Sequence, residues 1–458
     1  MSEQATKKLT STAGRAEGPG LVGQGLVGQG FSPDVKPAET AGALQAAEKL
    51  DPEGGGGFNP RIKPTGSTRA LAPEGRFSPI SHEIPSFSAA SFAPEVCLSR
   101  TQPTPRARVQ AMKEYHPPLG SRDALRLDFN ENTLACSPRV REVLGRVSAG
   151  DLTRYPEREP VEAIVAAHLG LAAPQVALTN GVDEAIHVLF ETYLEAGDEL
   201  LLPVPTYTMY EVYASATDAR VLTVQAADDL RFPFERLLAA ITPQTKIIAI
   251  ANPNSPSGSA ATRAQLVKIA SRAPHAVLLV DEAYFHFHGE TVIDLIGVVP
   301  NLVVARTFSK AYGLAGLRLG LLAGPFELMR WVRRVLSPYS VNSLALACLP
   351  PALEDAAYID WYVSEVLRAR HDFEAALDTA KLRRWPSRAN FILVDIGPKH
   401  AQFVRLMRAA GVLVRDRSSD PGCDGRVRIT IGTREQMQQA VVALNEVTAA
   451  LKLGGEAQ

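Results

Sequence analysis

The chain has 458 residues, of which 46% are hydrophobic and 21% are charged, so it is long enough for a globular protein with more than one hydrophobic core. Its formal net charge of -1 excludes the strongly basic surface that collects nucleic acid or an anionic membrane. The default partner is therefore a small-molecule substrate, and we expect neither nucleic-acid binding nor membrane association.

Residues 1–111 differ in composition from the rest of the chain. Gly, Pro, Ser, Ala and Gln dominate, and the pentad LVGQG at 21–25 is repeated at 26–30. Such a segment cannot bury enough apolar surface to offset the entropy of ordering it, so we predict a disordered low-complexity extension. Met112 opens the patterned sequence, and we hypothesise that it is the natural start. An intact mass of the native protein that matches residues 1–458 would refute this hypothesis.

From about residue 150 to residue 325, helix-like and strand-like patterns alternate along the chain. Short continuous apolar runs typical of buried strands occupy residues 247–251, 277–280 and 302–305. Strands that alternate with helices form a parallel sheet with helices on both faces, which predicts an α/β fold of the doubly wound type. Ligands of such sheets bind beyond the carboxyl ends of the strands. Polar clusters follow the runs, at 252–258 (NPNSPSG), 281–284 (DEAY) and 306–310 (RTFSK), so we predict one site at this edge.

After about residue 340 the pattern changes to longer helices and short strands, which predicts a smaller α+β domain. The expected helices cover residues 360–377, 402–410 and 434–451, and the expected strands cover residues 390–394 and 427–431. The active site should lie in the cleft between this domain and the large one.

Lys310 is the most informative single residue, because it lies in a loop just after an apolar strand. A lysine at such a position, near other cations, can lose its proton and condense with an aldehyde. Asp281 strengthens this interpretation, because a carboxylate at the end of an apolar strand needs a partner, and the ring nitrogen of pyridoxal phosphate is one. Tyr284 would donate to the ring oxygen of that cofactor. Alone, Lys310 would be interpreted as a surface lysine and Asp281 as a helix N-cap.

The order of these motifs resembles that of the class I and II aminotransferases of fold type I, which use pyridoxal 5'-phosphate. The matching motifs are NGVDE at 180–184, PTYTMY at 205–210, the clusters at 252–258 and 281–284, and SKAYGLAGLRLG at 309–320. Within this class the chain most resembles the histidinol-phosphate aminotransferases, on LDFNEN at 127–132, RYPE at 154–157, and VRDRS at 414–418 leading into VRITIGTRE at 427–435. The resemblance implies an N-terminal arm that begins the small domain (112–150), a large cofactor-binding domain (151–338) and a small C-terminal domain (339–454).

The resemblance implies a role for each matching residue. Lys310 would bind the cofactor covalently and move a proton between substrate and cofactor, Asp281 would pair with the ring nitrogen, and Tyr207 would stack on the ring. The other cofactor-binding residues would be Val182, Asp183, Thr307, Ser309 and Arg318 at the phosphate, with Tyr284 and either Asn254 or Ser255 at the ring oxygen. The last two stay alternatives, because Ser255 stands where the family usually has asparagine and Asn254 precedes it by one residue.

The reaction implied is transamination between histidinol phosphate and 2-oxoglutarate, which gives imidazole acetol phosphate and glutamate in histidine biosynthesis. Arg428 would hold the anionic end of the substrate, because its planar guanidinium suits both a phosphate and a carboxylate. Tyr115 and Asn132 would line the substrate pocket. Tyr155 would reach the active site of the neighbouring subunit in a homodimer.

Other functions fit the same motifs. An aromatic amino acid aminotransferase or a threonine-phosphate decarboxylase would use the same lysine, aspartate and phosphate-binding residues. A non-catalytic regulatory or binding protein could retain the fold, although the intact Lys310, Asp281 and Arg318 argue against this class. Formation of glutamate from histidinol phosphate and 2-oxoglutarate separates these alternatives.

The remaining features indicate a cytoplasmic enzyme without a metal. The four cysteines are far apart in the sequence, which is typical of neither a disulfide framework nor a zinc site. No apolar stretch approaches the roughly 20 residues that span a bilayer, and the N-terminus lacks the pattern of a secretory signal. His286 and His288 alternate on an expected strand, and without a third ligand they are interpreted as edge-strand histidines.

Overall fold

A computed structural model of the chain describes residues 103–112, 114 and 123–454. Most of the predicted disordered extension and the predicted substrate residue Tyr115 lie outside these described residues. All of the described residues belong to one compact unit.

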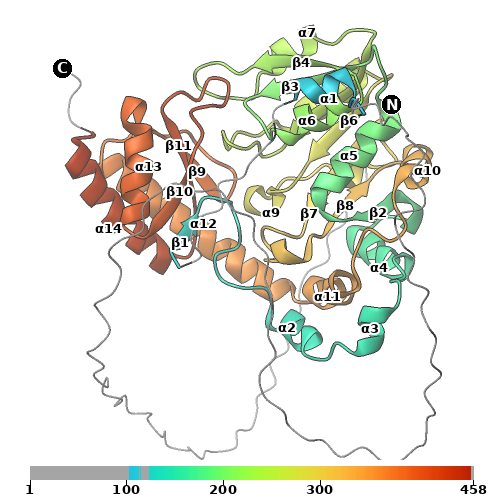
Figure 1. The fold of residues 1–458 in the computed structure, drawn as a ribbon, viewed down its shortest axis with the longest axis horizontal. Coiled ribbons are helices and arrows are strands. Elements are labelled where there is room, and N and C mark those ends of the chain that lie inside the picture. The colour runs from blue at the N-terminus through green and yellow to red at the C-terminus, as the bar shows by residue number, and fades with distance from the viewer. Residues whose placement is uncertain (1–102, 113, 115–122, 455–458) are drawn as a thin grey trace, which may run out of the picture. The chain divides into compact units, whose positions relative to one another are not determined.

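A seven-stranded sheet forms the centre of the large domain (Figure 1). Its strands are β2 (Val176–Thr179), β3 (Glu199–Val204), β4 (Arg220–Gln225), β5 (Thr245–Ala251), β6 (Val277–Asp281), β7 (Leu302–Thr307) and β8 (Gly320–Ala323). Their order is β2-β8-β7-β6-β5-β3-β4. Neighbouring strands from β4 to β7 are parallel, and β8 is antiparallel to both of its neighbours. The predicted α/β fold with a mostly parallel sheet is confirmed.

The continuous apolar runs arise because both faces of this sheet are covered. Ile248 and Ile250 of β5 lie in one hydrophobic core, whereas the alternate residues Ile247 and Ala249 lie in another. One core includes side chains of α5 (Gly181–Tyr193), α6 (Met209–Ala216) and α10 (Phe326–Val335). The other includes side chains of α4 (Glu159–Leu169), α7 (Phe234–Ala239), α8 (Arg263–Arg272), α11 (Ser343–Glu354) and α12 (Ala356–Thr379).

A second, four-stranded sheet forms the small domain, in the order β1-β10-β11-β9. Its strands are β1 (Leu125–Leu127), β9 (Phe391–Asp395), β10 (Val412–Asp416) and β11 (Arg426–Thr430). The helices α13 (His400–Ala409) and α14 (Arg434–Leu451) pack against each other, and α14 also contacts α12. The helices predicted at 360–377, 402–410 and 434–451 are therefore confirmed as α12, α13 and α14, and the strands predicted at 390–394 and 427–431 as β9 and β11.

The strand ends that carry the polar motifs meet at one edge of the large sheet. In the register of the parallel strands, Ala251 of β5 pairs with Asp281 of β6, which pairs with Ala305 of β7. The backbone continues this pairing, because Asn252 N–H donates to the carbonyl of Asp281 at 2.8 Å. The three motifs that follow these strands are therefore side by side.

Two local predictions were wrong. Residues 285–288 form the short helix α9 (Phe285–His288), not a strand, and Gly289 ends it with a positive φ of 83°. Residues 107–111 form the short helix α1 (Ala107–Ala111) in a segment predicted to be disordered, and Figure 1 shows it beside α6. A contact with the large domain helps to explain why this helix is ordered, since Arg108 Nη2 donates to the carbonyl of Ala219 at 3.2 Å.

The remaining helices α2 (Pro138–Leu144) and α3 (Ala149–Thr153) precede α4 and contact α11. None of the helices within the described ranges is both long and apolar enough to cross a membrane. Those ranges also contain no group of three side chains that could hold a metal ion.

Candidate active site

A cavity of about 320 Å³ lies where the ends of β5, β6 and β7 face the small domain. Most of the residues predicted from the motifs line it: Val182, Asp183, Tyr207, Ser255, Asp281, Tyr284, Thr307, Ser309, Lys310, Arg318 and Arg428. The residues come from both domains, because Arg428 belongs to β11 and Asp281 ends β6. The structure thus brings motifs that are far apart in the sequence to one cavity.

Three predicted residues do not line this cavity. Asn254 turns away from it, because its Nδ2 donates to the carbonyl of Pro205 at 2.9 Å and its Oδ1 accepts from Thr206 Oγ1 at 2.8 Å. Asn132 Nδ2 donates to the carbonyl of Ala311 at 3.2 Å. Tyr155 is 79% exposed. Of the two alternatives for the ring oxygen, Ser255 is the one that the structure places at the cavity.

Lys310 reaches the cavity from the loop after β7. Its Nζ donates to the carbonyl of Phe129 at 3.0 Å, which holds the amine near the small domain. The loop is fixed on the other side by Ser309 N–H, which donates to Thr307 Oγ1 at 3.1 Å. Gly313 has a φ of 70°, and a Cβ there would lie 3.0 Å from the carbonyl oxygen of Ala135. This tight turn therefore favours glycine.

Asp281 is a buried carboxylate, 5% exposed, at the end of β6. Its Oδ2 accepts from the Tyr210 hydroxyl at 2.8 Å, and its Oδ1 accepts from Ala283 N–H at 3.0 Å. In the described part of the chain, no lysine or arginine forms an ion pair with it. Burial raises the pKa of Asp281 to about 6, although the two hydrogen bonds oppose this shift. A positively charged ligand group at this carboxylate would compensate for its burial.

An anion-binding geometry lies at the start of α5. Val182 and Asp183 are in its first turn, where backbone N–H groups have no acceptor within the helix. Arg318 Nη2 is 2.9 Å from Asp183 Oδ2 and so brings a guanidinium to the same helix end. Gly181 has a φ of 78°, and a Cβ there would lie 2.8 Å from Arg318 Nη2. The absence of that side chain lets the guanidinium approach the helix.

Tyr284 is held by Asn130, which the sequence analysis did not assign to the site. Asn130 Nδ2 donates to the Tyr284 hydroxyl at 2.9 Å, and its backbone N–H donates to Thr430 Oγ1 of β11 at 3.0 Å. Asn130 has a φ of 55°, a conformation that asparagine adopts more readily than most residues. Its place inside the LDFNEN motif was the sequence feature that could have identified Asn130 as a site residue.

Three arginines line the part of the cavity nearest the small domain: Arg415, Arg417 and Arg428. Arg428 is buried, and it donates to Ser255 Oγ at 2.9 Å and to the carbonyl of Asp128 at 2.7 Å. Burial, followed by the neighbouring Arg417 guanidinium, lowers the pKa of Arg428 to about 10, so it stays protonated at neutral pH. Arg417 forms an ion pair with Asp420. This end of the cavity therefore suits an anionic group.

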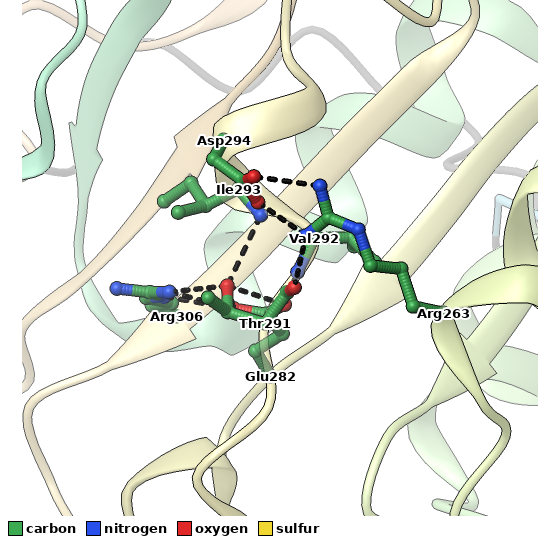
Figure 2. Close-up of polar contacts among 7 residues, drawn as sticks. All are labelled: Arg263, Glu282, Thr291, Val292, Ile293, Asp294 and Arg306. Carbon is green, nitrogen blue, oxygen red and sulfur yellow. Dashed lines mark hydrogen bonds and ion pairs between the residues drawn. The ribbon is translucent and has the colours of Figure 1, made fainter. Parts of the chain in front are cut away.

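The ends of β6 and β7 are joined by a buried ion pair (Figure 2). Glu282, directly after Asp281, accepts from Arg306 Nε at 3.0 Å and Nη2 at 2.8 Å. Thr291 and Val292 also donate to this carboxylate. Because Arg306 lies on β7, the pair connects the strand that ends at Asp281 with the strand that leads to Lys310.

We expect Arg306→Met to lower the free energy of unfolding by about 3–5 kcal/mol, because it leaves the buried Glu282 carboxylate without its cation. Chemical denaturation of the protein would measure this loss. The exposed pair of Arg263 and Asp294, also drawn in Figure 2, provides a matched control. Arg263→Met should cost less than about 1 kcal/mol, since exposed ion pairs contribute little. Equal losses for the two variants would contradict this expectation.

Comparison with known proteins agrees with this geometry. Residues 122–444 match the family described as "Aminotransferase class I and II". The chain belongs to this aminotransferase family. It is 33% identical over 367 residues to histidinol-phosphate aminotransferase from Moorella thermoacetica, which covers 76% of this chain and 94% of that protein. It is 31% identical over 347 residues to the Geobacillus sp. (strain WCH70) enzyme of that name, which covers 74% of this chain and 94% of that protein.

The aminotransferase is also similar to a solved structure that contains the cofactor. The crystal structure of histidinol-phosphate aminotransferase from Sinorhizobium meliloti in complex with pyridoxal-5'-phosphate matches with a TM-score of 0.70 and 26% identity. The match covers 77% of this chain and 99% of that one. The fold type I assignment is therefore confirmed, and the enzyme is a pyridoxal-phosphate-dependent aminotransferase. The cavity fits this cofactor, because it combines an amine, a buried carboxylate without a cation and an anion-binding helix end.

Proposed function

We propose that this aminotransferase transfers the amino group of histidinol phosphate to 2-oxoglutarate. The observation that carries the proposal is the group of three arginines, Arg415, Arg417 and Arg428, in the same cavity as Lys310 and Asp281. A phosphate ester brings up to two negative charges to that end, and guanidinium groups bind phosphate oxygens in pairs. The similarity to histidinol-phosphate aminotransferases supports the same substrate.

The residues of the cavity divide between holding the cofactor and handling the proton. Bound pyridoxal phosphate supplies an aldehyde that takes up the amino group and a ring that withdraws electrons from the substrate carbon. In our proposal Lys310 binds the cofactor covalently through Nζ and then carries a proton on that nitrogen. Asp281 keeps the ring nitrogen protonated, and Tyr207 covers the ring.

The cofactor phosphate is proposed to lie at the start of α5. The amides of Val182 and Asp183, the Arg318 guanidinium and the hydroxyls of Ser309 and Thr307 would bind it. At the opposite side of the ring, the Tyr284 hydroxyl and Ser255 would face the ring oxygen. Asn132 and Tyr115 remain proposed substrate contacts, which in the case of Asn132 requires its side chain to leave the carbonyl of Ala311.

One site must accept an amino donor and then an amino acceptor, because the acceptor takes the amino group and returns the cofactor to its starting form. Arg428 is suited to both, since its planar guanidinium can bind the phosphate of histidinol phosphate and a carboxylate of 2-oxoglutarate. Its hydrogen bonds to Ser255 and to the carbonyl of Asp128 fix its position before either substrate arrives. Substrate binding therefore does not lose free energy to the ordering of a flexible Arg428 side chain.

We further propose a homodimer in which Tyr155 contributes to the neighbouring active site. Tyr155 is 79% exposed and Tyr339 is 58% exposed, and their ring centroids lie 4.5 Å apart. Two exposed aromatic rings that pack together are typical of a protein interface. Sedimentation equilibrium should give the mass of two 49.3 kDa chains, and a single-chain mass at micromolar protein would contradict the proposal.

The test of the reaction is an assay of the cofactor-loaded enzyme with histidinol phosphate and 2-oxoglutarate. We expect glutamate to form, with histidinol phosphate preferred to phenylalanine and tyrosine in kcat/KM. A preference for the aromatic amino acids would indicate an aromatic aminotransferase. Release of carbon dioxide from threonine phosphate without glutamate formation would indicate a decarboxylase, and no reaction at all would indicate a binding protein.

A further inference from the structure

A tyrosine outside the cavity makes direct contact with the carboxylate at the end of β6. Tyr210 is fully buried in the first turn of α6, and its hydroxyl donates to Asp281 Oδ2 at 2.8 Å. It does not line the cavity, so it would not touch a bound cofactor or substrate. Any influence of this hydroxyl on the chemistry must therefore pass through Asp281.

We propose that Tyr210 is a positioning residue that keeps the Asp281 carboxylate oriented and ionised, so that it can hold the cofactor's ring nitrogen in its protonated form. This inference rests on the proposed contact between Asp281 and that nitrogen. The geometry supports it, because Asp281 has only two hydrogen-bond donors from the described chain, Tyr210 O–H and Ala283 N–H. They occupy different oxygens of the carboxylate and so fix its rotation.

The direction of the hydrogen bond follows from the surroundings of the two groups. Burial, together with the adjacent Asp281, raises the pKa of Tyr210 well above its ordinary value, so the phenol keeps its proton. The hydroxyl must then donate to an ionised carboxylate, which it stabilises relative to the protonated acid. Asp183 of α5 and Glu282 act in the opposite sense on Asp281, because their negative charges favour the protonated acid. Tyr210 is thus the side chain that offsets part of the increase in the pKa of Asp281 that burial causes.

The ring of Tyr210 has a second contact that the test must preserve. It packs edge-on against Tyr207, the residue proposed to cover the cofactor ring, with centroids 5.8 Å apart. Tyr210→Phe keeps this packing and removes only the hydroxyl. Tyr193→Phe is a matched control, because its hydroxyl donates to the carbonyl of Leu328 at 2.9 Å and it does not line the cavity.

The first measurement is the affinity of the apoenzyme for pyridoxal phosphate as a function of pH. Without the hydroxyl, a larger fraction of Asp281 is in the protonated acid form. We therefore expect Tyr210→Phe to bind the cofactor about tenfold more weakly near pH 7, which is the usual effect of losing a hydrogen bond to a charged group. The loss of affinity on acidification should also begin at a higher pH than in the unmodified enzyme. Tyr193→Phe should show neither change.

The second measurement reports the ring nitrogen directly. With ¹⁵N-labelled pyridoxal phosphate, the nitrogen resonance of the Tyr210→Phe enzyme should move toward that of the unprotonated ring. An unchanged resonance and an unchanged pH profile would overturn the inference. Asp281→Asn separates this outcome from failure of the parent proposal: if that variant also leaves the resonance and the affinity unchanged, Asp281 does not contact the ring nitrogen at all.

Discussion

Lys310→Ala should lower the rate of transamination by about 10⁴-fold or more, because in the proposed mechanism it removes both the covalent attachment of the cofactor and the group that carries the proton. We expect no other residue to take over this proposed role. Among the described residues that line the cavity, Lys310 is the only lysine. Its loop is fixed through Ser309 and Gly313. Lys310→Arg keeps the positive charge but not the nucleophile, so we expect it to be similarly inactive.

Two measurements test this expectation independently of the activity assay. Reduction of the cofactor-loaded enzyme with borohydride, followed by peptide mass spectrometry, should place the label on Lys310 and leave the Lys310→Ala protein unlabelled. Lys268→Ala provides the control, because Lys268 is exposed on α8, outside the cavity. A label on another lysine, or an Lys310→Ala enzyme with undiminished rate, would show that a different amine carries the chemistry.

The sheet and the main residues that line the cavity could be predicted because each has a recognisable local sequence pattern. A strand covered on both faces must be apolar at every position, which made β5, β6 and β7 visible as continuous runs. The carboxyl ends of parallel strands lie at one edge, so the polar motifs after these runs had to converge. Lys310 and Asp281 were found for this reason.

The contacts that tune the site could not be predicted, because they join side chains that are ordinary in their local sequence. Tyr210 has the pattern of a core aromatic on a helix, and only the tertiary structure places its hydroxyl at Asp281. Asn130 and Thr430 are far apart in the chain and meet only because β1 and β11 belong to the same four-stranded sheet. Glu282 and Arg306 each look like surface residues until the sheet pairs them.

The choice between Asn254 and Ser255 illustrates the same limit. Both residues carry a suitable polar group, and neighbouring positions of a loop often point in opposite directions. The direction is set by partners elsewhere, since Asn254 is drawn to Pro205 and Thr206 while Ser255 accepts from Arg428. The family motif identified the loop that reaches the cavity. The tertiary contacts were needed to identify which side chain of that loop faces the cavity.

Arg428→Leu should lower kcat/KM for histidinol phosphate by about 10²- to 10³-fold, since removal of one partner of a buried charge pair costs about 3–4 kcal/mol. Arg428 is buried, whereas Arg415 and Arg417 at the same end of the cavity are half-buried. Arg428→Lys keeps the charge without the planar pair of donors, so we expect an intermediate loss of about tenfold.

The effect must be separated from damage to the fold, because Arg428 also donates to Ser255 and to the carbonyl of Asp128. Histidinol, which lacks the phosphate, supplies this separation. If Arg428 binds the phosphate, the variant should lose most of its discrimination between histidinol phosphate and histidinol, while kcat/KM for histidinol, which does not depend on the binding of 2-oxoglutarate, changes little. If kcat/KM falls equally for the two amino donors, Arg428 supports the contact between the two domains and does not bind the phosphate, which would then be bound by Arg415 or Arg417.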